Sequence, residues 1–332
     1  MVAEKSCNFG RYICVKVAME HFEIIKCHGS GNDFILIDIC KDERLKSVDW
    51  SSFARVACNR DSSIGSDGLL LVVRDEDGVY GMDMLNPDGT HAEMCGNGIR
   101  CVARYAIEQG YISCVDILRS GGRDYRVAVA EPLAEGIAAY AVDINISLWS
   151  CDFALFDNGD TWLGKPIVAL SSALQFSALS LGNPHIVAAV DAIDMAELSL
   201  LGERVKEHVD ILPNGVNVSL YECRTPRSIF VATYERGAGI TLSCGTAMTA
   251  SATAAALLGF VERGERIEVK NRGGKVYCTT YPGEHIVTRL EGNATYVWRG
   301  DVSFEEGVVE CHITEDFGEQ ERWESFVKQI NE

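Results

Sequence analysis

The sequence predicts an α+β protein of two similar domains, each a curved mixed sheet wrapped around one central helix. Two observations support this prediction. Landmarks of the first half return in the second half after 149 to 151 residues, and each half contains short apolar runs followed by one helical stretch. Because the landmarks keep their order and spacing, we infer an internal duplication. The matching landmarks are Gly31-Asn32 with Gly182-Asn183, Asp67 with Asn217, Asn86 with Glu235, and Cys95 with Cys244.

The predicted strands are short apolar runs bounded by glycine or charged residues, a pattern typical of buried strands. In the first half they cover Phe34–Ile37 and Leu69–Val73. The second half repeats them at His185–Val190 and Val216–Leu220, and a further run follows at Ile229–Ala232. The equivalent positions indicate that the two halves share one strand plan.

The predicted helices cover Ile99–Gln109 in the first half and Ala247–Leu258 in the second. Gly110 and Gly259 follow them, where a left-handed residue commonly ends a helix. Alanine, threonine and serine dominate the second helix. Small side chains let strands pack close to a helix, so we expect each sheet to enclose its helix.

Each predicted helix begins at or just after a Cys-Gly sequence, Cys95-Gly96 in the first half and Cys244-Gly245 in the second. The first turn of a helix carries free N–H groups and a partial positive charge. It therefore favours a bound carboxylate and lowers the pKa of a thiol placed there. Two related domains that face each other can place these two thiols on opposite sides of one ligand.

Length and composition limit the classes of protein to consider. The chain has 332 residues, 47% of them hydrophobic, and a net charge of −18, which argues against a nucleic-acid or anionic-membrane surface. We expect no membrane span and, at the N-terminus, no signal peptide, which indicates the cytoplasm. The 13 cysteines follow no disulfide framework or Cys-x-x-Cys pairing, so we expect reduced thiols and no metal.

The predicted domains cover residues 20–150 and 151–305, and residues 306–332 form a C-terminal extension. No linker is visible by composition between about 125 and 178, where the domain break falls. The extension combines Trp323 with Glu319, Glu321 and Glu324, a pattern that suggests an amphipathic helix docked on the body.

Several motifs together resemble the diaminopimelate epimerase family of cofactor-independent amino acid racemases. The resemblance covers roughly residues 22 to 303, and it is specific because all the motifs occur in the family's order. Met19 stands where the family's start is expected, so two interpretations of the first 18 residues stay open, a translation-start artefact or an unneeded extension. The motifs are His28-Gly29-Ser30-Gly31-Asn32-Asp33-Phe34, Asn86-Pro87-Asp88-Gly89, Cys95-Gly96-Asn97-Gly98-Ile99-Arg100-Cys101, Gly182-Asn183-Pro184-His185, Gly215-Val216-Asn217-Val218, and Glu235-Arg236-Gly237-Ala238-Gly239 leading to Cys244-Gly245-Thr246.

The resemblance implies an isomerase of lysine and peptidoglycan precursor synthesis that converts LL-diaminopimelate to meso-diaminopimelate without a cofactor, in a cleft between the domains. Inverting an α-carbon requires that a proton leave one face and another arrive at the opposite face. Two thiols, one of them a thiolate, can do this without moving around the substrate. The partner expected is a small amino acid, and a homodimer is compatible with the resemblance.

The resemblance also implies residue roles. Cys95 and Cys244 are the catalytic thiols, with His185 beside Cys95 and Glu235 beside Cys244. Backbone N–H groups at Gly96-Asn97 and Gly245-Thr246 would hold the reacting carboxylate. The polar ends of the substrate would be bound by the remaining amides and an arginine, Asn32, Asn86, Asn183, Asn217 and Arg236.

Two positions depart from the family pattern. The family usually has an acidic residue at Ile240 and a glycine at Ala247, so a different amino acid substrate stays open. One alternative is therefore a racemase of another amino acid, such as histidine, on the same fold. A second alternative, from another class, is an amino acid binding protein in which the cysteines only pack.

Overall fold

The computed structural model describes residues 20–148, 153–154, 161–281, 283–305 and 307–331. The predicted domain boundary at 150/151 and the predicted N-terminal extension lie outside these residues. Within the described part of the chain, no helix is long and apolar enough to cross a membrane.

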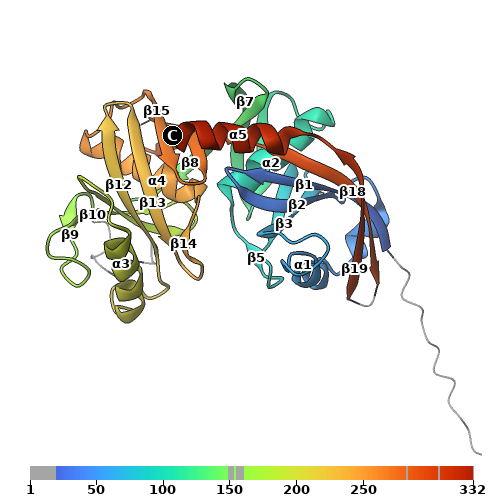
Figure 1. The fold of residues 1–332 in the computed structure, drawn as a ribbon, viewed down its shortest axis with the longest axis horizontal. Coiled ribbons are helices and arrows are strands. Elements are labelled where there is room, and N and C mark those ends of the chain that lie inside the picture. Colours follow the sequence, from blue (N-terminus) through green and yellow to red (C-terminus); the bar gives the residue numbers. More distant parts are fainter. Residues whose placement is uncertain (1–19, 149–152, 155–160, 282, 306, 332) are drawn as a thin grey trace, which may run out of the picture.

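The first half contains most of one lobe (Figure 1). Its two predicted strands lie within β2 and β3, which are parallel to each other. Strands β4 and β6 form a second parallel pair, and all other pairings in this half are antiparallel. The elements are β1 (Glu20–Gly29), β2 (Asn32–Asp38), η1 (Glu43–Ser47), α1 (Trp50–Ala57), β3 (Gly68–Arg74), β4 (Tyr80–Leu85), β5 (His91–Ala92), α2 (Gly96–Glu108), β6 (Val115–Ser120), β7 (Arg123–Ala134) and β8 (Ile137–Ile146).

The second half repeats this plan. Its parallel pairs are β11 with β12 and β13 with β15, at the places that correspond to those of the first half. The duplication inferred from the sequence is therefore visible in the order of the strands. The elements are β9 (Lys165–Pro166), β10 (Gln175–Ser180), β11 (Pro184–Ala189), α3 (Met195–Glu207), β12 (Asn217–Thr225), β13 (Ser228–Glu235), β14 (Gly239–Thr241), α4 (Gly245–Leu258), β15 (Arg266–Asn271), β16 (Gly274–Tyr281), β17 (Ile286–Asn293), β18 (Thr295–Glu305), β19 (Val308–Asp316) and α5 (Glu319–Asn331).

The two halves exchange strands along their common border. Strands β8 and β17 pair antiparallel, from Ile146 opposite Ile286 to Ala139 opposite Asn293. Beyond this pair, β8 continues to a bridge between Ser147 and Ser180 of the second half, while β18 returns to pair with β1 of the first half. The predicted division into domains stays a prediction, since the strand pairing joins the halves into one sheet.

One helix lies inside each curved sheet, as predicted. Most residues of α2 and α4 are buried, which is typical of a helix surrounded on all sides. The hydroxyl groups of Thr249 and Thr253 in α4 donate to the carbonyl groups one turn earlier, at 2.8 Å each, so they can be buried. Gly110 and Gly259 follow the two helices with φ of 70° and 79°, which confirms the predicted left-handed ends.

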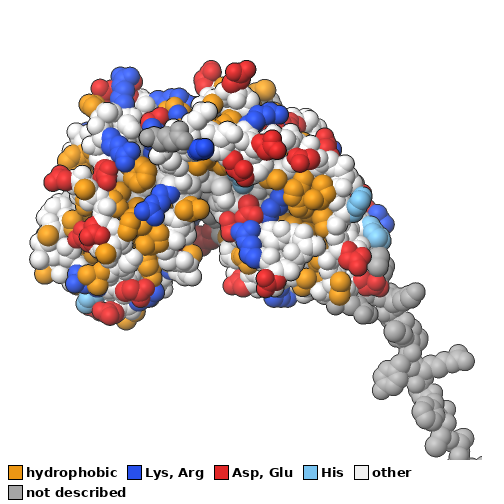
Figure 2. All heavy atoms as spheres, in the orientation of Figure 1, with side chains coloured by type: hydrophobic (Ala, Val, Ile, Leu, Met, Phe, Trp, Pro, Cys, Tyr) orange, Lys and Arg blue, Asp and Glu red, His pale blue; other side chains and the backbone are white. Residues whose placement is uncertain are grey.

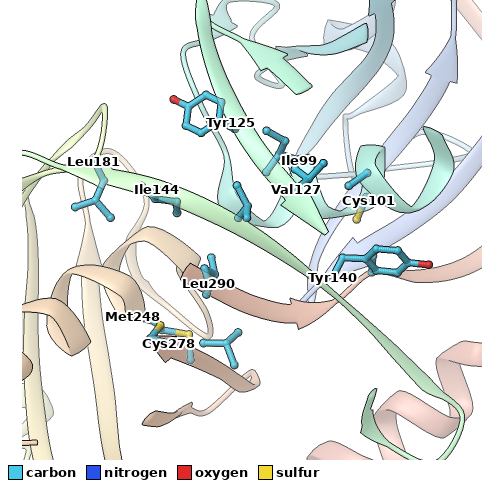
Figure 3. Close-up of a cluster of buried hydrophobic side chains, with 14 of the residues drawn as sticks. Ile99, Cys101, Tyr125, Val127, Tyr140, Ile144, Leu181, Met248, Cys278 and Leu290 are labelled. Atoms are coloured by element: carbon cyan, nitrogen blue, oxygen red, sulfur yellow. The ribbon is translucent and has the colours of Figure 1, made fainter. Parts of the chain in front are cut away.

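The main core continues through both lobes. Figure 3 shows Ile144 of β8 and Leu290 of β17 in the middle of this core, between Ile99 of α2 and Met248 of α4. All four side chains are fully buried. Since both central helices pack against β17, the position of one helix depends on the other.

The C-terminal extension ends in the predicted helix, α5, which runs across both lobes (Figure 1). Trp323 and Phe326 are buried against Leu133 and Ile137 of the first half. At the start of α5, Glu319 accepts two hydrogen bonds from Arg104 of α2, at 2.6 and 2.7 Å. The prediction of an amphipathic helix docked on the body is therefore confirmed.

His28 of β1 lies under α5, and its ring centroid is 5.3 Å from that of Trp323. Its Nδ1 accepts hydrogen bonds from the N–H of Gly31 and from Asn293 Nδ2, at 3.2 Å each, so the proton of the neutral ring is on Nε2. Burial lowers the pKa of His28 to about 4, against the opposing effects of Asp33 and Glu319.

We expect the free energy of unfolding in urea to decrease as the pH falls from about 6.5 to about 4. In this range the unfolded chain binds a proton at His28, because its ordinary pKa is 6.5, and the folded chain does not. The substitution His28→Gln removes this titration. It should make the pH dependence shallower by up to about 1.4 kcal/mol per pH unit.

His312 is exposed and serves as the matched control, because His312→Gln should leave the pH dependence unchanged. Equal slopes for wild type and His28→Gln would contradict the assignment of His28 as a buried neutral histidine.

Candidate active site

A cleft of about 2120 Å³ lies between the two lobes and draws residues from both halves. Figure 2 shows the surface hollowed between the lobes. Charged and amide side chains predominate among the predicted site residues on its wall. Those that line it are Asn32, Asn86, Asn183, Glu235 and Arg236.

The two predicted thiols occupy equivalent places in the two halves of the chain. Cys95 and Cys244 are the N-cap residues of α2 and α4, with extended φ/ψ of −138°/112° and −131°/109°. The two helices meet at their N-termini, because a Cβ atom at Gly245 would lie 2.8 Å from Asn97 Oδ1. Glycine at position 245 therefore permits an approach that a larger residue would prevent.

Cys95 is partly buried and has polar neighbours on two sides. The N–H of Gly98 donates to its sulfur at 3.4 Å, and its S–H faces Asn32 Oδ1 at 3.8 Å. Burial raises the pKa of Cys95 to about 11, although the backbone N–H groups of Gly98 and Asn97 act in the opposite direction. In the ligand-free protein this residue is therefore a thiol at neutral pH.

The amide of Asn32 is held in one orientation. Its Nδ2 donates to Asp67 Oδ2 at 2.8 Å, while its Oδ1 accepts from Asn97 Nδ2 at 3.2 Å. Asp67 in turn forms a salt bridge of 2.5 Å with Arg60. Because a carboxylate only accepts hydrogen bonds, Asp67 requires the amide nitrogen of Asn32 on its side and turns the oxygen toward Cys95.

Cys244 has a carboxylate beside it. Glu235 and Cys244 interact electrostatically, and Thr241 Oγ1 donates to Glu235 Oε1 at 2.5 Å. Burial raises the pKa of Glu235, and burial together with the charge of Glu235 raises the pKa of Cys244. The Thr246 hydroxyl lies 3.5 Å from the sulfur. This carboxylate can accept the proton of the thiol.

His185 is fully buried at the start of β11, opposite Asn217 of β12. Its Nε2 donates to Asn183 Oδ1 at 3.1 Å, and Asn183 Nδ2 donates to Thr246 Oγ1 at 3.3 Å. Burial, and to a smaller extent Arg236, lower the pKa of His185 to about 3, so its ring is neutral.

The Nδ1 atom of His185 has no hydrogen-bond partner among the described residues. It is therefore a buried, unprotonated acceptor. The structure brings together Glu235 and Cys244, but it shows no hydrogen bond between His185 and Cys95 among the residues it describes. The placement of His185 beside Cys95 stays a prediction.

The remaining predicted binding residues each form hydrogen bonds with nearby groups of the protein. Asn86 Nδ2 donates to Thr90 Oγ1 at 3.0 Å. Asn217 Oδ1 accepts from the N–H of Arg236 at 2.9 Å, and Arg236 Nη1 donates to Asn214 O at 2.8 Å. Asn217 is 7% exposed, and its amide oxygen holds the loop that carries Arg236 by this hydrogen bond.

The two departures from the family pattern lie in different environments. Ile240 of β14 is 41% exposed, and Thr241 and Leu242 next to it line the cleft. Ala247 is fully buried, and its backbone N–H acts to lower the pKa of Cys244, against the larger effect of burial. A methyl group at position 247 therefore fits in the first turn of α4 while the N–H stays available to the thiol.

The sequence prediction assigned no role to the charged residues that support Asn32. Asp67 appeared only as a landmark of the duplication, and Arg60 did not appear at all. Their contact depends on the fold, since Asp67 immediately precedes β3 and Arg60 follows α1. Among the described residues, no group of three His, Cys, Asp or Glu side chains could hold a metal ion.

Comparison with known proteins gives consistent results. The family model described as diaminopimelate epimerase matches residues 24–128 and 177–297. A diaminopimelate epimerase of Clostridium acetobutylicum is 37% identical over 292 residues, which cover 86% of this chain and 87% of that one. One of Lactiplantibacillus plantarum is 37% identical over 328 residues, covering 93% of this chain and 98% of that one.

Solved structures support the fold. A phenazine biosynthesis protein of the PhzF family from Bacillus anthracis has a TM-score of 0.62 at 14% identity, covering 86% of this chain and 99% of that one. A hydroxyproline epimerase from Agrobacterium vitis has a TM-score of 0.58 at 15% identity, with 86% and 93% covered. These likenesses confirm the predicted α+β fold of two similar lobes. The family model and the sequence relatives together show that the chain belongs to the diaminopimelate epimerase family.

Proposed function

We propose that this chain inverts one α-carbon of LL-diaminopimelate to give meso-diaminopimelate, with Cys95 and Cys244 as its two bases. The observation that carries the proposal is the pair of N-cap cysteines at helix N-termini that meet beside one cleft. The names of the sequence relatives support the choice of substrate.

In the proposed reaction, the thiolate of one cysteine takes the α-proton as the S–H bond forms and the C–H bond breaks. The thiol of the other cysteine then gives its proton to the opposite face of the same carbon. The two cysteines end with exchanged protonation states, so the reverse reaction follows the same path. Two N-cap thiols at helices that meet are suited to these roles because neither has to move around the substrate.

Negative charge develops on the substrate carboxylate as the α-proton leaves. The free N–H groups at Gly96-Asn97 and Gly245-Thr246 start the two helices, where the helix dipole favours an anion. Donors that are already in place stabilise such charge without reorganising. In this proposal they replace the stabilisation that a cofactor supplies in other racemases.

Each thiol must be able to lose its proton before turnover, because burial raises both pKa values in the ligand-free protein. Glu235 lies close enough to Cys244 to affect the pKa of its thiol and is suited to accept its proton. We assign the corresponding role for Cys95 to His185, whose neutral ring has an unpartnered Nδ1 among the described residues. Asn32, Asn86, Asn183, Asn217 and Arg236 would bind or support the polar ends of the substrate.

We also propose that the protein forms a homodimer. Two exposed apolar side chains on the same face of β6 support this: Val115 and Ile117 are 52% and 45% exposed. Burying them in an interface would remove apolar surface from water. Light scattering of the wild-type protein and of Ile117→Lys would test this proposal, since a monomeric wild type excludes it.

Incubation of wild type with LL-diaminopimelate in deuterated water should give deuterium at the α-carbon together with inversion. Cys95→Ala and Cys244→Ala should each reduce inversion by at least about 100-fold, the usual contribution of a general acid or base. NMR reports the exchange, and chiral chromatography reports the inversion. Cys223→Ala is the matched control, because Cys223 is exposed on β12.

The same assay separates the alternatives. Exchange with histidine or another L-amino acid, but none with diaminopimelate, would replace the proposed substrate. If wild type exchanged no amino acid while wild type and both cysteine variants still bound one, the protein would be a binding protein.

Asp67→Asn should lower kcat by about tenfold or more. A hydrogen bond to a charged group contributes roughly 1.5–3 kcal/mol, and without the carboxylate the amide of Asn32 is free to reverse. Asp61→Asn is the matched control, because Asp61 is an exposed residue of the same loop. Steady-state kinetics of both variants measures kcat and KM separately. A normal kcat for Asp67→Asn would show that the orientation of Asn32 does not matter.

A further inference from the structure

Arg100 of α2 is a fully buried cation with neutral partners. Its guanidinium donates to Gly96 O at 2.7 Å, Asn97 Oδ1 at 3.0 Å, Asn293 O at 3.2 Å and Ser30 Oγ at 3.3 Å. Among the described residues no carboxylate lies within salt-bridge distance, which is 4.0 Å or less. A buried charge is normally paired, because moving it out of water is costly.

A second arginine of the same helix shows the usual arrangement. Arg104 lies one turn later and is 8% exposed, but it pairs with Glu108 at 2.8 Å and with Glu319 at 2.6 Å. Burial within α2 therefore does not prevent pairing with a carboxylate. The lack of one at Arg100 leaves its positive charge uncompensated among the described residues, so the charge can act on its surroundings.

Two glycines make room for this guanidinium. A Cβ atom at Gly292 of β17 would lie 2.8 Å from Nη2 of Arg100, and one at Gly29 of β1 would lie 3.0 Å from the same atom. Strands that belong to opposite halves of the chain thus leave space for one side chain. The two glycines therefore form a site whose shape fits a guanidinium group.

The charge lies next to Cys95. The bond to Gly96 O brings the guanidinium back to the N-terminal end of α2, where the helix dipole is also positive. The titratable groups around it are Cys95 and Cys101 of α2, Cys278 of β16 and His28 of β1. Burial lowers the pKa of Arg100 only to about 10, so the group stays charged at neutral pH, and its charge lowers the pKa of Cys95.

Arg100 also fixes the amide of Asn97. Because the guanidinium only donates, Asn97 must present its Oδ1 to Arg100 and its Nδ2 to Asn32 Oδ1. Asn32 in turn faces Cys95 with the same oxygen. Arg100 therefore affects Cys95 in two ways. Its charge acts on the thiol directly, and it orients the amides of Asn97 and Asn32 next to it.

We propose that Arg100 is a positioning residue of the active site, which stabilises the anionic form of Cys95 by a fixed buried charge and orients Asn97 where α2 meets α4. The link to turnover rests on the proposed function. The effect on the thiol does not, because it can be measured without substrate.

The test is the alkylation rate of Cys95 by iodoacetamide from pH 7 to 9, followed by mass spectrometry of the peptide that contains it. In this range Arg100 is charged and Cys95 is mostly protonated, so the rate follows the small fraction of thiolate. Arg100→Met keeps the bulk and removes the charge. It should make alkylation about tenfold slower, as for a thiol whose pKa is one pH unit higher. Arg100→Lys, which keeps a charge, should restore most of the rate.

Arg104→Met is the matched control: it should lower stability without changing the alkylation rate of Cys95, because the charge of Arg104 is paired. If Arg100→Met does not fold by circular dichroism, Arg100→Gln is measured in its place, since its amide can keep one hydrogen bond. A folded neutral variant that is alkylated at the wild-type rate would overturn the proposal. Slower alkylation of the variant, together with a wild type that exchanges no amino acid, would refute the proposed function and leave this inference standing.

Discussion

The structure depends on the contact between the N-termini of α2 and α4, where Asn97 lies against Gly245. Each helix is enclosed by its own sheet, so neither can move toward or away from the other without disturbing a packed core. The contact sets where the two N-cap cysteines lie in relation to the cleft. It also explains why a glycine is needed at position 245, since any Cβ atom there would meet the amide of Asn97.

The exchange of strands between the halves supports this contact. Strands β8 and β17 lie side by side, and Ile144 and Leu290 from them pack between the two helices. The chain then crosses, because β18 pairs with β1 of the first half. Helix α5 spans both lobes and is tied to α2 through Glu319 and Arg104. Strand pairing and α5 therefore both connect the lobes, and α5 also lines part of the cleft between them.

The equivalent scaffolds carry different chemistry. Near Cys95 the partners are amides, oriented by the anion of Asp67 on one side and the cation of Arg100 on the other. Near Cys244 the partner is the carboxylate of Glu235, and the hydroxyl of Thr246 lies close. The duplication accounts for the common frame, and the side chains around the two thiols differ between the halves.

The sequence by itself determined five of the strands (β2, β3, β11, β12 and β13), the central helices and their glycine ends, because apolar runs and glycine conformation are local properties. It also determined which residues start α2 and α4, since Cys-Gly recurs at equivalent places. It did not determine β8, β17 and β18, which join the two halves. Only the tertiary structure decided that Asp67 holds Asn32, that Arg100 is buried without a carboxylate among the described residues, and that Gly29 and Gly292 make room for it. These contacts join residues far apart in the chain, and the energy of a buried charge depends on its surroundings and not on its sequence neighbours.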